Sequence, residues 1–244
     1  FEGKKELFEG LAIEKMETEW KKFPILHLDL NAKKYETPAD LIAMLNQTLE
    51  KWEVVYGNVK KDRSPEERFT YVIERAYEQA GCGVVVLVDE YDKPLLQALD
   101  NDTLLEDYRK TLKAFYGVLK SADRYLRFVF LTGVTKFSQV SAFGDLNQLN
   151  DISLDYSYAT VCGITRTELA ETFTPEIEEF GRVNKLSAEE TVDKMARQYD
   201  GYHFHPKGDG VFNPFSVLNA CKSKILDNFW FQTGTPTYLV NLLK

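Results

Sequence analysis

Residues 84–88 constrain the fold most: they form the unbroken apolar run Val-Val-Val-Leu-Val, which ends abruptly in Asp89 and Glu90. Such a run, without polar alternation, is typical of a strand that is buried on both faces, as in a parallel sheet. In open α/β sheets, ligands bind at the carboxyl ends of the strands. The run therefore predicts a parallel strand that carries two adjacent carboxylates to a ligand-binding edge.

Other apolar runs and amphipathic segments alternate along the first two thirds of the chain. This order predicts right-handed βαβ units, and hence an α/β fold with a mainly parallel sheet and flanking helices. We expect further strands at 25–30, 127–132 and 158–164, and helices at 5–22, 38–52, 66–80 and 103–121.

The pattern changes after residue 164. Thr165 with Glu168, and Ser187 with Glu190, are capping boxes that predict short helices. Residues 202–204 and 211–212 flank a Gly-rich turn and predict a hairpin. We therefore expect two domains, an α/β core over 1–164 and a helical lid or winged-helix-like subdomain over 165–244.

Composition excludes some classes of partner. The net charge of −8 disfavours broad electrostatic binding to nucleic acid or to anionic membranes. No apolar run is long enough for a membrane span. Three widely spaced cysteines, Cys82, Cys162 and Cys221, are expected to be reduced core thiols, and we expect a cytoplasmic protein.

The apolar run that ends in Asp89-Glu90 matches the Walker B pattern of NTPases. Asp89 would hold Mg²⁺, directly or through water, and Glu90 would polarise the attacking water. The plainer interpretation is a solvated loop after a core strand. The matching Walker A loop, G-x-x-x-x-G-K-[ST], is absent from the 244 residues.

Neighbouring strand ends supply further candidates. Thr132 and Thr135 follow the apolar residues 128–131, so either hydroxyl would serve as a γ-phosphate sensor or orient the water, although threonine also commonly ends a strand. Asp29 is expected at the same sheet edge as Asp89, where it would help to line the nucleotide site. His27 is more simply a core or edge histidine.

Two other kinds of site are weaker. His203 and His205 lie on the same side of a predicted strand, as metal ligands would, but no third ligand is close in sequence. A metal-dependent nuclease would use Asp89, Glu90 and Lys93. That spacing is poor, because the nuclease signature places lysine two residues after an acid.

Eight ordered motifs together resemble the AAA-ATPase-like family, which is common in gut Bacteroidetes and other anaerobes. The resemblance covers nearly the whole chain. The motifs are Val-Asp-Glu-Tyr-Asp-Lys-Pro-Leu at 88–95, Leu-Lys-Ser-Ala-Asp at 119–123, Phe-Leu-Thr-Gly-Val-Thr-Lys-Phe-Ser at 130–138, Leu-Asn-Asp-Ile-Ser-Leu-Asp at 149–155, Cys-Gly-Ile-Thr at 162–165, Tyr-Asp-Gly-Tyr-His-Phe at 199–204, Val-Phe-Asn-Pro-Phe-Ser at 211–216 and Phe-Gln-Thr-Gly-Thr-Pro at 231–236.

The resemblance implies a P-loop NTPase of the ASCE type, with ATP and Mg²⁺ as cofactors. It makes Asp89 and Glu90 the Walker B pair and places Thr132 and Thr135 in the sensor strand. Family members usually carry a strand and a Walker A loop upstream, and many carry a PD-(D/E)XK nuclease domain downstream. We therefore expect a piece of a longer bacterial protein, inactive alone, with a groove of unpaired backbone between two buried strands where the Walker A strand belongs.

Two functions follow as rival hypotheses. The first is the core of an ATP-binding and ATP-hydrolysing protein, with protein or DNA partners engaged through flanking domains. The second is a non-catalytic protein- or DNA-interaction module built on a degenerate NTPase fold. Binding of Mg-ATP separates the two.

Overall fold

The computed structural model describes residues 1–58, 62–134 and 149–229. The chain forms two compact units, Phe1–Asn150 and Asp151–Lys244. The predicted domain boundary between residues 164 and 165 stays a prediction.

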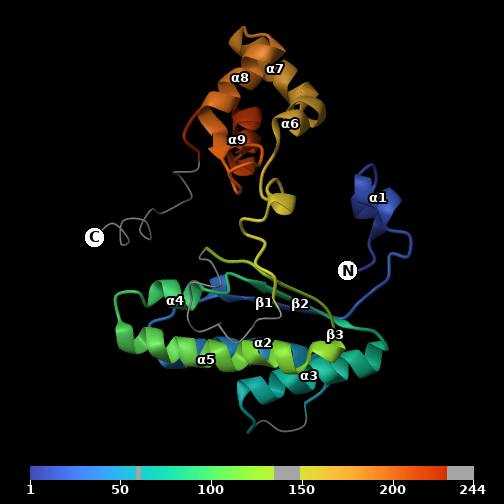
Figure 1. Ribbon diagram of the computed structural model, residues 1–244, viewed down its shortest axis with the longest axis vertical. Coiled ribbons are helices and arrows are strands. Elements are labelled where there is room, and N and C mark those ends of the chain that lie inside the picture. The colour runs from blue at the N-terminus through green and yellow to red at the C-terminus, as the bar shows by residue number, and fades with distance from the viewer. Residues whose placement is uncertain (59–61, 135–148, 230–244) are drawn as a thin grey trace. The chain divides into compact units, whose positions relative to one another are not determined.

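A three-stranded parallel sheet forms the centre of the first unit (Figure 1). Its strands lie in the order β1 (Ile25–Asp29), β2 (Val84–Asp89) and β3 (Leu126–Leu131), and β2 pairs in parallel with both neighbours. The prediction of an α/β fold with a parallel sheet is confirmed. The expected groove between two buried strands is wrong for this sheet, because the three strands are adjacent.

Three long helices lie against one face of the sheet (Figure 1). They are α2 (Pro38–Tyr56), α3 (Pro65–Ala80) and α5 (Asp102–Ser121). Their starts follow the sequence signals: Thr37 and Ser64 form capping boxes before α2 and α3, each with proline at the start of the helix, and Asn101 caps α5.

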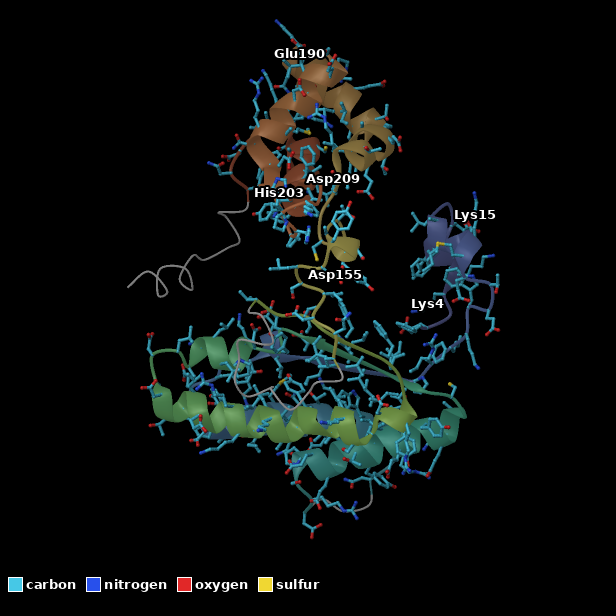
Figure 2. The ribbon with its side chains drawn as sticks, viewed as in Figure 1. Lys4, Lys15, Asp155, Glu190, His203 and Asp209 are labelled. Carbon is cyan, nitrogen blue, oxygen red and sulfur yellow. The ribbon has the colours of Figure 1, made fainter. Side chains whose placement is uncertain are left out.

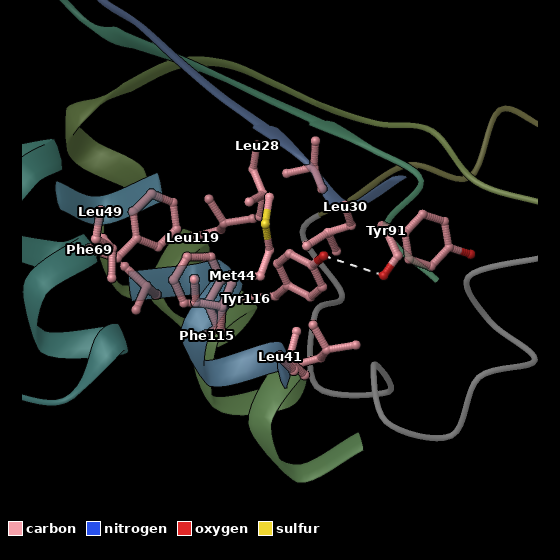
Figure 3. Close-up of a cluster of buried hydrophobic side chains, with 14 of the residues drawn as sticks. Leu28, Leu30, Leu41, Met44, Leu49, Phe69, Tyr91, Phe115, Tyr116 and Leu119 are labelled. Carbon is pink, nitrogen blue, oxygen red and sulfur yellow. Dashed lines mark hydrogen bonds between the residues drawn. The ribbon is translucent and has the colours of Figure 1, made fainter. Parts of the chain in front are cut away.

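Alternate residues of β1 and β2 point toward these helices. In β1, Leu26 and Leu28 are buried whereas His27 is exposed, as period-two alternation predicts. The layer between sheet and helices is aromatic: Phe69 stacks on Phe115 at 4.5 Å between ring centroids and on Trp52 at 5.6 Å. Figure 3 shows this cluster, in which the hydroxyl of Tyr116 donates to the backbone carbonyl of Tyr91 at 3.4 Å.

The other face of the sheet carries its own rows of side chains. Ile25, Val85 and Phe128 are register partners, and so are His27, Leu87 and Phe130 one step nearer the carboxyl ends. Phe128 and Phe130 stack on each other, yet they are 41% and 39% exposed. The strand predicted as buried at 127–132 is therefore an edge strand of this sheet with a half-open apolar face.

The predicted helix over 5–22 is wrong as one element. The structure has a 3-10 turn η1 (Lys5–Phe8), then the short helix α1 (Ala12–Met16). Gly10 separates them with φ of +78°, which a continuous helix excludes. Leu7 and Leu11, which a single amphipathic helix over 5–22 would bury, are exposed.

Short elements complete the first unit. The turn η2 (Leu30–Ala32) follows β1, α4 (Lys93–Gln97) follows β2, and η3 (Asp123–Tyr125) leads into β3.

The second unit has a separate core. It contains η6 (Tyr156–Tyr158), α6 (Arg166–Thr172), α7 (Thr174–Asn184), α8 (Ala188–Tyr199), the antiparallel pair β4 (Asp200–Tyr202) and β5 (Val211–Phe212), and α9 (Pro214–Ser223). The predicted capping boxes at Thr165 and Ser187 are confirmed. The predicted hairpin forms, but its first strand is β4 and not 202–204, so His203 and His205 do not lie on a strand.

The strand predicted over 158–164 is wrong. Residues 156–158 form a 3-10 turn, and Ile164 makes an isolated antiparallel bridge to Phe212. The segment has strand-forming side chains, but Tyr158 and Val161 are exposed, so no buried sheet position stabilises it as a strand. The sequence also predicts a short strand at 229–231 and a last helix from Thr235, and from residue 230 onward both lie outside the described residues.

Candidate functional site

The carboxyl ends of the three parallel strands bring together polar residues from distant parts of the sequence. Asp29 and Asp89 are register partners in β1 and β2. Thr132 follows β3 directly, and its backbone N–H donates to the carbonyl of Val88 at 2.9 Å, which extends the ladder by one residue. The parallel pairing of β2 thus delivers Asp29, Asp89 and Thr132 to one edge.

One side-chain contact joins two of these strand ends. The hydroxyl of Thr132 donates a hydrogen bond to Oδ1 of Asp89. The side chain of Asp29 instead accepts from the backbone N–H of Asn31 at 2.8 Å, where it caps the turn η2. The edge therefore offers carboxylate and hydroxyl oxygens, the donors that Mg²⁺ prefers.

Glu90 has an unusual backbone conformation. Its φ is +55°, in the left-handed region that residues with a side chain rarely adopt. The backbone N–H of Lys93 donates to the Glu90 carbonyl at 2.9 Å, which closes the turn into α4. Strained backbone of this kind is typical of functional sites, where the surrounding structure holds it in place.

The electrostatics of the edge make the Glu90 carboxylate more basic than usual. Burial raises the pKa of Glu90 above 4.5, and the negative charges of Asp92, Asp89 and Asp29 raise this pKa further, whereas Lys93 lowers it. A carboxylate with a raised pKa is better suited to accept a proton from water.

Asp92 is a residue of this region that sequence reasoning did not single out. It lies two residues beyond Glu90 and is fully buried. Both of its carboxylate oxygens accept the backbone N–H of Val134, at 3.2 Å and 3.1 Å. The only signal in the sequence is a third acid two residues after Glu90, and that pattern is equally typical of a solvated loop.

The remaining candidates fall elsewhere or outside the described residues. Thr135 lies outside them. His203, labelled in Figure 2, and His205 belong to the second unit, and the described part of the chain contains no cluster of three or more metal-ligating side chains. His205 instead packs edge-on against Tyr156 at 5.4 Å between ring centroids.

The cysteines and the helices bear on two further expectations. The three cysteines are free thiols, but only Cys221 is buried and Cys162 is exposed, so the expectation of core thiols is wrong for Cys162. Every helix within the described ranges is too short or too polar to cross a lipid bilayer.

Two cavities of about 270 Å³ and 210 Å³ both lie in the second unit. The first is lined by α6, α7 and α8 and the second by the end of α8, β4 and the start of α9, and neither includes Asp89 or Glu90. The side chain of Asp89 is exposed, so the candidate site is an open edge of the sheet.

Comparisons with known proteins give a family match for the part of the chain that holds this edge. A family model described as "Predicted AAA-ATPase" matches residues 1–143, which hold all three strands and the acidic edge. A protein of Azotobacter chroococcum mcd 1, named "Uncharacterized protein in vnfD 5'region", is 35% identical over 243 residues. The alignment covers 100% of this chain and 45% of that protein, so the chain spans less than half of the relative's length. No solved structure matches the chain.

Proposed function

Because the chain belongs to the predicted AAA-ATPase family, we propose that its acidic sheet edge is the magnesium–nucleotide site of an ATP-hydrolysing protein. The observation that carries this proposal is the hydrogen bond from Thr132 to Asp89, which joins the ends of β3 and β2 next to Glu90. It groups a carboxylate, a hydroxyl and a basic carboxylate at the edge where open α/β sheets bind ligands.

Each residue has a role that follows from its chemistry. Asp89 would hold Mg²⁺, directly or through water, and the hydroxyl of Thr132 orients the Asp89 carboxylate. When bound, Mg²⁺ would neutralise charge on the triphosphate. Glu90 would accept a hydrogen bond from the attacking water and draw its proton away, a role that its raised pKa favours. Asp29 adds negative charge to the same edge, and Thr135 remains a second candidate sensor.

The proposal extends to sequence beyond the 244 residues. They contain no G-x-x-x-x-G-K-[ST] loop, and the Azotobacter relative is more than twice as long as the matched region. We propose that a phosphate-binding loop of the P-loop type comes from outside these residues, and that residues 165–244 act as a winged-helix-like lid. Tests of catalysis therefore use the full-length natural protein.

The direct test replaces Glu90 with glutamine. Glu90→Gln keeps the size of the side chain but removes the base, so we expect ATP binding to remain and steady-state hydrolysis to fall about 100-fold or more. Glu106→Gln is the matched control, because Glu106 is exposed on α5 and pairs only loosely with Arg109 and Lys110. Hydrolysis at the wild-type rate in Glu90→Gln would remove Glu90 from this role.

A non-catalytic interaction module is the second candidate, and the exposed pair Phe128 and Phe130 favours it. Exposed apolar patches on a sheet commonly mark sites of protein association. Calorimetric titration with Mg-ATP separates the two functions. Binding supports the nucleotide site, and its absence in the full-length protein supports the interaction module.

A further inference from the structure

The Asp92 side chain connects the loop after β2 to the loop after β3. An aspartate at a helix N-cap ordinarily accepts hydrogen bonds from the first turn of its own helix. Asp92 is the N-cap of α4 but makes no such bond, and both of its oxygens accept the N–H of Val134 instead. A fully buried carboxylate is costly without hydrogen bonds, so this contact stabilises one particular loop position.

Two further contacts close the same junction. The backbone N–H of Tyr91 donates to the carbonyl of Thr132 at 2.9 Å. Gly133 packs so tightly that a Cβ atom there would lie 2.5 Å from the Tyr91 ring and 2.6 Å from Oδ1 of Asp92. The junction therefore requires glycine at 133 and holds both loops together through backbone and side-chain contacts.

The junction lies immediately beside the candidate site. Glu90 precedes Tyr91 in the chain, and Thr132 precedes Gly133. A change in the spacing of the two loops would move the hydroxyl of Thr132 relative to the carboxylate of Asp89, which accepts its hydrogen bond. The hydrogen bond between Thr132 and Asp89 thus depends on Asp92, which does not lie at the open edge.

We infer that Asp92 is a positioning residue, which holds the loops after β2 and β3 in register so that Thr132 keeps the Asp89 carboxylate oriented toward one divalent cation. This inference rests on the proposed function. Partners that orient metal-binding side chains commonly change metal affinity or activity by about 10–100-fold when they are replaced.

The test uses two variants that alter the junction from opposite sides. Asp92→Asn keeps the shape but removes the charge and one acceptor oxygen, whereas Gly133→Ala introduces the Cβ atom for which there is no room. Asp100→Asn is the matched control, because Asp100 is exposed in the same region. Each variant of the full-length protein is measured for the Mg²⁺ concentration that gives half-maximal ATP hydrolysis, and for hydrogen exchange at the Val134 amide.

Both junction variants should raise the half-maximal Mg²⁺ concentration about 10-fold or more, and Val134 should exchange faster, while Asp100→Asn matches wild type. A loss of folded protein alone would lower the maximal rate without moving the Mg²⁺ midpoint. Faster Val134 exchange with an unchanged Mg²⁺ midpoint would overturn the inference. Absence of hydrolysis in wild type would instead overturn the proposed function, and the positioning role of Asp92 with it, while the exchange data would still report whether the junction exists.

Discussion

Two regions of the first unit surround their carboxylates with opposite charge environments. In the helical layer, Glu53 is buried, and its two carboxylate oxygens accept hydrogen bonds from Nε and Nη2 of Arg68, each at 2.7 Å. Nη1 of Arg68 donates a third hydrogen bond, to Oδ1 of Asn46, at 2.7 Å. At the sheet edge, by contrast, burial raises the pKa of Glu90, and the negative charges of Asp92 and Asp89 raise this pKa further.

The charge environments of Glu53 and Glu90 therefore indicate a structural role for Glu53 and a functional role for Glu90. A carboxylate that is matched by a bidentate arginine has its oxygens fully used by the protein. Several acids gathered at one edge repel one another, so a bound cation would stabilise them. The comparison therefore predicts that changes in the helical layer alter stability, whereas changes at the edge alter ligand binding and can even stabilise the protein.

The largest effect is expected for the buried ion pair. Arg68→Met leaves Glu53 buried without its partner, so we expect a loss of about 3–5 kcal/mol in the free energy of unfolding. The double variant Arg68→Met with Glu53→Leu should recover most of this loss, because it removes both charges. Chemical denaturation of the two variants and wild type measures the difference. A single variant within about 1 kcal/mol of wild type would contradict the assignment of this pair as structural.

A smaller effect of opposite sign is expected at the edge. Glu90→Gly removes the side chain from a backbone with φ of +55°, so we expect a gain of about 1 kcal/mol in stability and a loss of hydrolysis. Lys185→Gly provides the comparison, because Lys185 is an exposed C-cap with φ of +57°. We expect it to gain stability without any loss of activity. If the Glu90→Gly variant were less stable than wild type, the backbone at Glu90 would not be strained.

The smallest effect concerns pH. The pKa of Glu90 is raised in the folded state, so the stability that Glu90 contributes is fully present below its unfolded value near 4.5 and is lost as pH rises through the folded pKa. Glu90→Gln should therefore gain stability relative to wild type between pH 4 and pH 7. Because Glu90 is partly exposed, the change should stay below about 1 kcal/mol. Thermal melting at both pH values measures it, and the opposite trend would mean that the folded pKa is lowered.

The sequence was most informative where a long hydrophobic pattern coincides with a surface that tertiary packing buries. Strand β2 and helix α5 lie within one residue of their predicted bounds, because each has a long pattern that packing reinforces. The predictions over 5–22 and 158–164 failed because these segments have the composition of a helix or a strand, but their apolar side chains do not pack against another apolar surface. The local sequence pattern does not predict whether such a surface is present.

The candidate site shows the same division. Asp89, Glu90 and Thr132 were predictable because each lies at the end of an apolar run, and parallel strands place such ends together. Asp92 was not, because its burial and its contact with Val134 depend on how two loops meet 42 residues apart in sequence. Whether an acid in a turn is solvated or buried is decided by tertiary packing.

The most direct test of a nucleotide site at the sheet edge is binding of Mn²⁺, a paramagnetic substitute for Mg²⁺, to the full-length protein with ATP present. Electron paramagnetic resonance reports free and bound Mn²⁺ in wild type, in Asp89→Asn and in the control Asp100→Asn. We expect ATP-dependent Mn²⁺ binding that Asp89→Asn weakens about 10-fold or more and that Asp100→Asn leaves unchanged. Equal Mn²⁺ affinity in wild type and Asp89→Asn would contradict the placement of the nucleotide site at this edge of the sheet.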